Sequence, residues 1–243
     1  MGASVLKKQK YLASLEEEES LGFFSTPKIF IGIDEVGRGC LAGPVFAAAA
    51  WVDRKWLMDS GWTGGTRPKN VALPWLLEIG DSKALSPKQR EELHDQILAC
   101  APFIQVRVAS ASAKEIDAIN ILRASHLAME RATADLEKTT TSADIIMVDG
   151  HMVPQGLKPR GRPLIKGDAR SLLIGVASIV AKVIRDRHML SLDEKFPGYG
   201  LAKHKGYPTP QHWKALSEIG PCAEHRLSFR GVADPIQQQL SLL

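Results

Sequence analysis

The stretch IFIGIDEVGRGCLAG, residues 29–43, decides how the rest of the sequence is interpreted. Its apolar start, rich in β-branched and aromatic residues, is typical of a buried strand. That strand ends in two acids, Asp34 and Glu35, and a Gly-Arg-Gly turn follows at once. Neither core packing nor solubility requires two carboxylates at the exit of a strand, so the segment predicts a functional site.

Two later apolar segments also end in acids. DIIMVDG (144–150) ends at Asp149, and RPLIKGD (162–168) ends at Asp168. Ligand groups gather where sheet strands give way to loops, so Asp34, Glu35, Asp149 and Asp168 are expected to converge if their strands are neighbours. Taken singly, such an acid is more often a turn former or a helix N-cap. The consecutive pair after residue 33 is the least easily explained in that way.

The remaining segments alternate between strands and helices. Strands are predicted at 43–52 and 103–110, with a loop of undefined shape over 53–80. Helices are predicted at 86–100, 112–138, 172–196 and 208–220 from apolar periodicity. Ser86 is the predicted N-cap of the first helix, and Ser112 with Glu115 forms a capping box on the second. The pattern predicts a mixed α/β domain with a helical C-terminal portion.

Composition excludes several classes of protein. With 44% hydrophobic and 24% charged residues, the chain of 243 residues is typical of globular proteins. No apolar run approaches the ~20 residues of a membrane span, and the N-terminus lacks the apolar region of a secretory signal. The three cysteines are widely spaced, which indicates neither a zinc site nor a disulfide framework. A cytoplasmic location and no membrane association are therefore expected.

Basic residues are concentrated in one part of the chain. The net charge is +4, yet residues 158–187 hold eight Lys and Arg against two Asp. That local excess suits the phosphate backbone of a nucleic acid. A solvated basic face is an equally ordinary explanation. Asp186, four residues after Lys182 and flanked by arginines, is interpreted as an ion-paired residue rather than a catalytic one.

Clustered carboxylates require a cation. Close acids raise one another's pKa, and oxygen ligands of this kind select hard ions such as Mg²⁺ or Mn²⁺. Two such ions about 4 Å apart stabilise both the attacking and the leaving oxygen of a phosphodiester.

A nucleotide cofactor is not expected. Gly37, Gly39 and Gly43 form a loose dinucleotide-binding pattern. A pyrophosphate would then lie beside two carboxylates, and Pro44 falls where a helix should follow.

Several motifs together resemble the ribonuclease HII family. They are DEVGRG (34–39), VDG (148–150), KGD (166–168), VASIVAK (176–182) and HKGY (204–207), with GDSKALS, IDAINIL, FPGYGLAKHKGYPT and EHRLSF adding to the match. Each motif is weak alone, but their order and combination are specific. The resemblance spans roughly residues 29–230, and the Gly-Arg-Gly segment matches the HII type rather than HIII.

The resemblance implies a fold and an activity. It implies a ribonuclease H-like fold, in which a five-stranded mixed sheet is flanked by helices and followed by a C-terminal helical region. The implied boundaries are an N-terminal extension at 1–27, a catalytic domain at 28–198 and a C-terminal region with a tail at 199–243. The implied activity is hydrolysis of RNA in RNA/DNA hybrids and incision 5′ of single ribonucleotides in duplex DNA, leaving a 3′-hydroxyl and a 5′-phosphate.

The same resemblance implies roles for individual residues. The metal-binding acids would be the four already selected, with Mg²⁺ or Mn²⁺ as cofactor and two ions during catalysis. Glycines bring bare backbone close to the minor groove, where the turn would bind the 2′-hydroxyl that separates RNA from DNA. Phosphate contacts position the duplex without reading sequence. The implied substrate-binding residues are Gly37, Arg38, Gly39, Ser82, Lys83, Ser178, Lys182, Arg185 and Tyr207.

Other interpretations of these residues stay open. Ser178 is equally suited to packing within a helix interface, Tyr207 alone would be a half-buried core tyrosine, and Arg38 alone a surface arginine. His204 and His225 are interpreted as structural, because their spacing is not that of a zinc motif.

We expect a monomer that acts on RNA/DNA hybrids and on DNA containing ribonucleotides. The competing hypotheses are a non-catalytic hybrid-binding module and another ribonuclease H-like nuclease acting on branched DNA.

Overall fold

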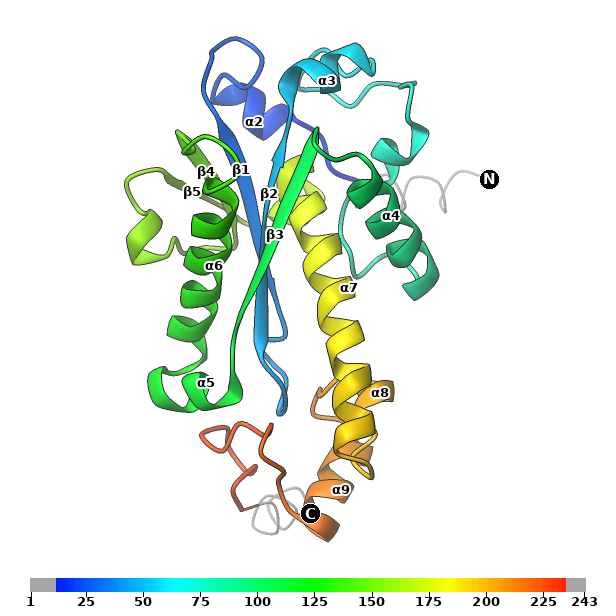
Figure 1. The fold of residues 1–243 in the computed structure, drawn as a ribbon, viewed down its shortest axis with the longest axis vertical. Coiled ribbons are helices and arrows are strands. Elements are labelled where there is room, and N and C mark those ends of the chain that lie inside the picture. Colours follow the sequence, from blue (N-terminus) through cyan, green and yellow to red (C-terminus); the bar gives the residue numbers. More distant parts are fainter. Residues whose placement is uncertain (1–11, 235–243) are drawn as a thin grey trace.

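The computed structural model describes residues 12–234, in which a five-stranded sheet forms the centre (Figure 1). Its strands are β1 (Phe30–Val36), β2 (Val45–Val52), β3 (Ile104–Ala111), β4 (Ile145–Asp149) and β5 (Gly161–Leu164), and their order across the sheet is β3-β2-β1-β4-β5. β1 pairs antiparallel with β2, which pairs antiparallel with β3, whereas β4 and β5 continue the sheet in parallel. The expected five-stranded mixed sheet is confirmed.

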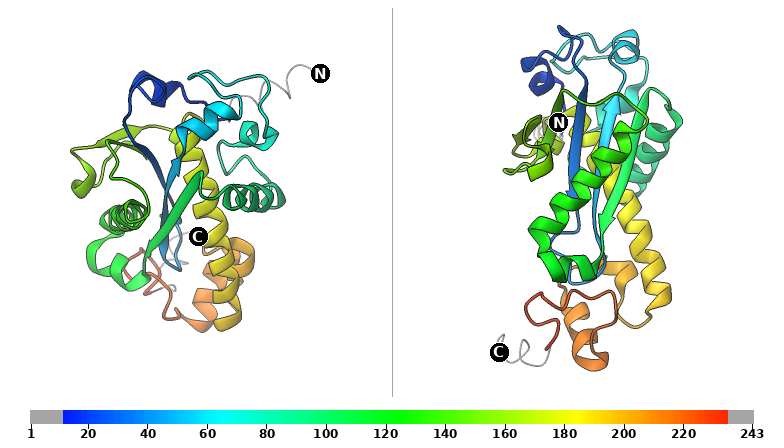
Figure 2. Two further views of the ribbon diagram at one scale, coloured as in Figure 1. Left: turned by 45° about the horizontal axis from the view of Figure 1, so that its top comes forward. Right: turned by 60° about the vertical axis from the view of Figure 1, so that its left-hand side comes forward.

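Helices cover both faces of the sheet (Figures 1 and 2). On one face lie α7 (Leu172–Lys195) and α4 (Pro87–Ala99), and on the other lies α6 (Ile121–Glu137) after α5 (Ala113–Ile119). Alternate residues of each strand point to opposite faces. Phe30 of β1 accordingly joins the core cluster of α7, and Ile31 joins the cluster of α6. Within the described residues, no helix is long and apolar enough to cross a bilayer.

The α7 backbone lies directly against β1. A Cβ added at Gly32 would lie 2.3 Å from the carbonyl carbon of Leu173, so only glycine permits this approach. The run of alanines in β2, residues 47–50, likewise presents small side chains to both helix layers. The first turns of α7 are thereby held close to the strand that ends in the acid pair.

The chain after α7 folds back over one end of the sheet. α8 (Leu201–His204), α9 (Pro210–Ile219) and the segment that follows lie near the loop joining β1 to β2 (Figure 1). Leu41 and Ala42 of that loop share a core cluster with Met189 of α7 and Leu216 of α9. The C-terminal region therefore supports the loop that follows the acids.

The segment before β1 packs onto the main body of the molecule. It contains α2 (Glu16–Ser20), and Leu15 and Phe23 are buried in the cluster that includes α7. Ser14 also bridges to Ser171. The sequence left open whether this segment is helical or disordered. From residue 12 onward it is ordered against the sheet domain, whereas residues 1–11 and the C-terminal tail lie outside the described range.

Two predicted elements differ from the structure. The single helix expected over 112–138 is wrong, because Asn120 has a φ of 67° and separates α5 from α6. A residue with positive φ cannot continue a right-handed helix, and the Asn120 side chain accepts from the Arg123 amide and so caps α6. The strand predicted to end at Asp168 is also wrong, because β5 ends at Leu164 and the left-handed φ of 56° at Lys166 turns the chain away from the sheet before Asp168. The 53–80 loop, whose shape the sequence left undefined, contains α3 (Arg54–Asp59) and a 3-10 turn, η1 (Pro74–Glu78). The caps at Ser86 and Ser112 are confirmed.

Candidate active site

The predicted acids lie at one end of the central strands. β1 and β4 are paired with Ile33 opposite Val148, so Asp34 and Asp149, one step further, lie side by side about 4.8 Å apart in strand spacing. Both fall on the α7 face of the sheet. Asp168 lies in the 3-10 turn η3 (Gly167–Ala169), and the Gly167 amide donates to Asp149 Oδ1 at 2.7 Å.

The carboxylates raise one another's pKa. Asp34 is only 7% exposed. Burial raises its pKa well above the usual value, and the charges of Glu35, Asp149 and Asp168 raise it further. Burial also raises the pKa of Glu35, although Arg38 opposes that shift. Burial and Asp149 together raise the pKa of Asp168 to about 6. The cluster is electrostatically costly on its own, and a bound cation would offset that cost.

The donor set fits a hard divalent cation. Within residues 12–234, no three His, Cys, Asp or Glu side chains already converge as a metal site. Instead the Glu35 carboxylate binds Arg38, and the other three each accept from a backbone amide. Each of these bonds uses one oxygen of its carboxylate. The other oxygen stays available as a ligand of the kind that Mg²⁺ and Mn²⁺ prefer.

The Gly-Arg-Gly turn lies directly after these acids. Gly37 has a φ of 93°, and a Cβ there would lie 2.2 Å from Arg185 Nε. Gly39 faces open space, with nothing within 4 Å of an added Cβ. Arg38 is half exposed and pairs with Glu35 at 3.1 Å. The turn therefore offers an unobstructed backbone beside the carboxylates. Because Gly43 is followed by β2 rather than a helix, the dinucleotide-binding pattern lacks its phosphate-binding helix.

The expected phosphate contact of Arg185 is wrong. Its side chain is 0% exposed, and its guanidinium donates to the carbonyl oxygens of Lys205 at 3.0 Å and of Pro44 and Ala42 at 3.4 Å. The reason is that α7 is buried around most of its surface instead of having one exposed face. Arg185 supports the turn from beneath.

Ser82 and Ser178 are also buried, at 3% and 4% exposure, and their hydroxyls bond to each other at 2.9 Å. This bond agrees with the interface role left open for Ser178, whose hydroxyl also lowers the pKa of the neighbouring Asp34 carboxyl by a hydrogen bond. Together they hold the segment that carries Lys83 against α7.

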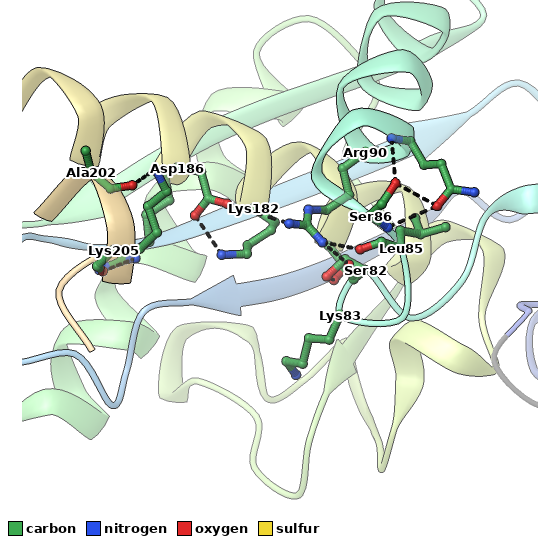
Figure 3. A network of polar contacts seen from close by, with 12 residues as sticks. Ser82, Lys83, Leu85, Ser86, Arg90, Lys182, Asp186, Ala202 and Lys205 are labelled. Carbon is green, nitrogen blue, oxygen red and sulfur yellow. Dashed lines mark hydrogen bonds and ion pairs between the residues drawn. The ribbon is translucent and has the colours of Figure 1, made fainter. Parts of the chain in front are cut away.

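Lys83 points toward the acids. Burial opposes its charge, but Asp34 and Asp168 raise its pKa overall. Figure 3 shows its side chain extending away from a network in which Arg90 Nη1 donates to the carbonyls of Ser82 and Leu85, at 2.8 and 2.6 Å. Arg90 was not predicted from the sequence, because an arginine within a helix gives no local sign of being buried.

Lys182 and Asp186 form a partly buried ion pair at 2.6 Å, with Arg90 Nη2 3.9 Å from the same acid (Figure 3). The prediction that Asp186 is ion-paired is confirmed. Tyr207 is 39% exposed, so it is not a core residue. In the basic stretch, Arg160, Arg170 and Arg187 bind acids elsewhere in the chain. Much of that positive charge is therefore neutralised within the protein.

Comparison with known sequences gives one family. The sequence model described as Ribonuclease HII matches residues 31–60 and 66–232. Ribonuclease HII of Ruegeria pomeroyi is 45% identical over 208 residues, which cover 86% of this chain and 79% of that protein. Ribonuclease HII of Shewanella loihica is 44% identical over 210 residues, covering 86% and 90%.

Solved structures agree in fold. Ribonuclease H2 from Pyrococcus horikoshii matches with a TM-score of 0.63 at 25% identity, over 88% of this chain and 99% of that one. A Bst ribonuclease HIII in complex with Mn²⁺ matches with a TM-score of 0.60 at 18% identity, over 88% and 70% of the two chains. The family match covers most of the chain, including all four acids. The chain therefore belongs to the ribonuclease HII family of metal-dependent endoribonucleases.

Proposed function

We propose that this enzyme hydrolyses the RNA strand of RNA/DNA hybrids and nicks duplex DNA on the 5′ side of a single embedded ribonucleotide. The observation that supports this most directly is the contact between the acid cluster and the turn, through the Glu35–Arg38 ion pair at 3.1 Å. A site that cleaves and a site that senses the sugar are thus only a few residues apart.

The acids would hold the catalytic ions. Asp34, Glu35, Asp149 and Asp168 are the residues we assign to bind Mg²⁺ or Mn²⁺, with two ions present during hydrolysis. Such ions supply an activated water and stabilise the leaving oxygen. The raised pKa values of Asp34, Glu35 and Asp168 support the assignment, because these carboxylates gain most from a nearby cation.

The turn would distinguish RNA from DNA. Gly39 leaves its backbone open to solvent, so a nucleic acid minor groove can approach it and its peptide groups can bind a 2′-hydroxyl. Tyr207, partly exposed nearby, would pack against the sugar at the RNA-DNA junction. Lys83, Arg38 and Lys182 remain candidates for phosphate contacts, which would position the duplex without reading its sequence.

A nicking assay tests the proposed function. Asp34→Asn should lower Mg²⁺-dependent nicking of a duplex with one ribonucleotide by about 100-fold or more, since loss of even an outer-shell metal partner costs about 10–100-fold. Asp59→Asn is the matched control, because Asp59 is exposed and pairs with Lys55 at the surface. Chelator should abolish nicking by the wild type. Undiminished activity of a folded Asp34→Asn protein would contradict the metal-binding role.

The same assay separates the alternative substrate. The proposal predicts that the wild-type enzyme nicks the one-ribonucleotide duplex and leaves an all-DNA junction intact. Preferential cleavage of the junction would favour a nuclease for branched DNA.

A further inference from the structure

A buried chain of hydrogen bonds runs behind the turn and Tyr207. His212 Nδ1 lies 3.0 Å from the carbonyl oxygen of Tyr207, and His212 Nε2 lies 3.0 Å from His225 Nε2. His225 Nδ1 accepts from the Cys222 amide at 3.0 Å. Both rings are almost completely buried. Neither lies among the acids, so the proposed hydrolysis gives them no task.

The proton positions in this chain follow from the partners. A carbonyl oxygen only accepts, so His212 Nδ1 carries a proton and His212 Nε2 is an acceptor. The Cys222 amide only donates, so His225 Nδ1 is unprotonated and its Nε2 carries the proton. His225 therefore donates to His212, and both rings are neutral. Burial lowers the pKa of each ring to about 4, which agrees with that assignment.

The loop around Tyr207 is held by these rings. The ring of His204 stacks on His212 at 4.4 Å, and His204 Nε2 lies 2.8 Å from the carbonyl oxygen of Tyr199. The Tyr207 carbonyl also accepts from the Thr209 amide at 2.8 Å. The peptide group of Tyr207 is thus fixed from two sides, one of which is His212. The prediction that His204 and His225 are structural agrees with these contacts.

The other end of the chain reaches the Gly-Arg-Gly turn. Arg226, next to His225, is buried and donates to the carbonyl oxygens of Arg38 and Gly43, both at 2.9 Å. The backbone of His225 also bridges to Ala42. The pair of rings therefore lies between the segment that carries Tyr207 and the segment that carries Arg38.

We propose that the His212–His225 pair is a positioning device that fixes Tyr207 relative to the Gly37–Gly39 turn and so sets discrimination between ribonucleotide and deoxyribonucleotide. This inference rests on the proposed function. Two groups that must contact one sugar tolerate little relative movement, because a displacement of about 1 Å can cost about 100-fold in an enzyme. A buried, fully satisfied polar pair specifies one arrangement more strictly than apolar packing does.

Two substitutions at His225 isolate the bond between the rings. His225→Gln keeps a donor where Nε2 was, whereas His225→Asn keeps an acceptor where Nδ1 was but is too short to reach His212. The dissociation constants for a one-ribonucleotide duplex and for an all-DNA duplex are measured in chelator, which prevents cleavage. The proposal expects the ratio of the two constants to fall about five- to tenfold in His225→Asn, the value of one hydrogen bond. His225→Gln should retain the ratio within about twofold.

Leu136→Ala is the control for general loss of stability, because Leu136 is buried in α6 within a different core cluster from the one beneath the turn and the rings. It should lower the thermal midpoint and leave the ratio unchanged. Should His225→Asn not fold, His212→Gln replaces it: this variant keeps an acceptor for His225 but loses the donor to Tyr207, and the same fall in ratio is expected.

Three results would overturn the positioning role: an unchanged ratio in His225→Asn, or in His212→Gln where it is the replacement; an equal fall in His225→Gln; or an equal fall in Leu136→Ala. A wild-type ratio near one would instead overturn the proposed function and this inference with it. Wild-type preference for the ribonucleotide duplex that persists in His225→Asn would contradict the positioning role alone.

Discussion

Two glycines in the turn have different physical tasks. Gly37 has a positive φ and lies against buried Arg185, whereas Gly39 has neither constraint. The first is a requirement of the fold, and the second leaves space for a partner. At the scale of single residues, two glycines only two positions apart in the chain, about 7 Å when extended, therefore have different physical roles.

Alanine substitutions should separate these two tasks. Gly37→Ala should lower the unfolding free energy by about 1–3 kcal/mol, because it combines strain at positive φ with a contact to Arg185. Gly39→Ala should change stability by less than about 1 kcal/mol yet weaken binding of a one-ribonucleotide duplex. Urea unfolding and equilibrium binding in chelator measure the two effects. Equal stability losses in both variants would contradict this division.

At the scale of elements, α2 is tied to the start of α7 by a buried acid. Glu18 is fully buried, and its Oε1 accepts from Ser171 Oγ at 2.6 Å and from the Leu173 amide at 3.3 Å. Burial raises the pKa of Glu18 to about 7. The contact joins the segment before the sheet to the helix that packs on β1.

This contact predicts a pH dependence of stability. Between pH about 4.5 and 7 the folded protein holds a proton on Glu18 that the unfolded chain releases, so this carboxyl's contribution to the unfolding free energy falls as pH rises. Glu18→Gln keeps the acceptor and removes the charge. It should therefore raise the unfolding free energy relative to wild type by about 1–3 kcal/mol at pH 8 and by little at pH 4.5.

The control for Glu18 is its neighbour. Glu17 pairs with Arg170 at the surface, so Glu17→Gln should change stability by at most about 1 kcal/mol. Urea unfolding at pH 4.5 and pH 8 gives both comparisons. A Glu18→Gln variant that is less stable than wild type at pH 8 would show that the carboxylate is favourable where it lies.

At the scale of the whole molecule, the acids come from β1, β4 and η3, so one ion would link distant parts of the chain. An ion that binds the folded state alone adds RT ln(1 + [L]/Kd) to the free energy of unfolding. This is about 1.4 kcal/mol when the ion concentration is ten times the Kd. Mn²⁺ should therefore raise the thermal midpoint at constant ionic strength. Asp34→Asn should start from a higher midpoint without metal, since it removes one repelling carboxylate, and should gain less on adding Mn²⁺. An equal rise of the thermal midpoint in both proteins would show that Mn²⁺ binds elsewhere.

Local signals in the sequence determined much of this protein. Neighbours within a few residues determine the strand that leads into Asp34 and the caps at Ser86 and Ser112, and they place the acids just after strands. Such patterns can be interpreted directly. The motif order gave the family and the fold it implies. The break at Asn120 was also local, but the apolar periodicity continued through it and concealed it.

Only the tertiary structure decided which polar residues are buried. Arg185 has the local pattern of an exposed helical residue, yet it binds carbonyls more than 140 positions away in the chain. Three buried hydrogen bonds likewise form only when the chain is folded: Ser82 with Ser178, Glu18 with Ser171, and His212 with His225. The physical reason is that exposure depends on which distant segments cover a side chain. The sequence thus determined the chemical groups and their local conformation, and long-range packing decided which of them are exposed beside the acids and which are buried beneath the turn.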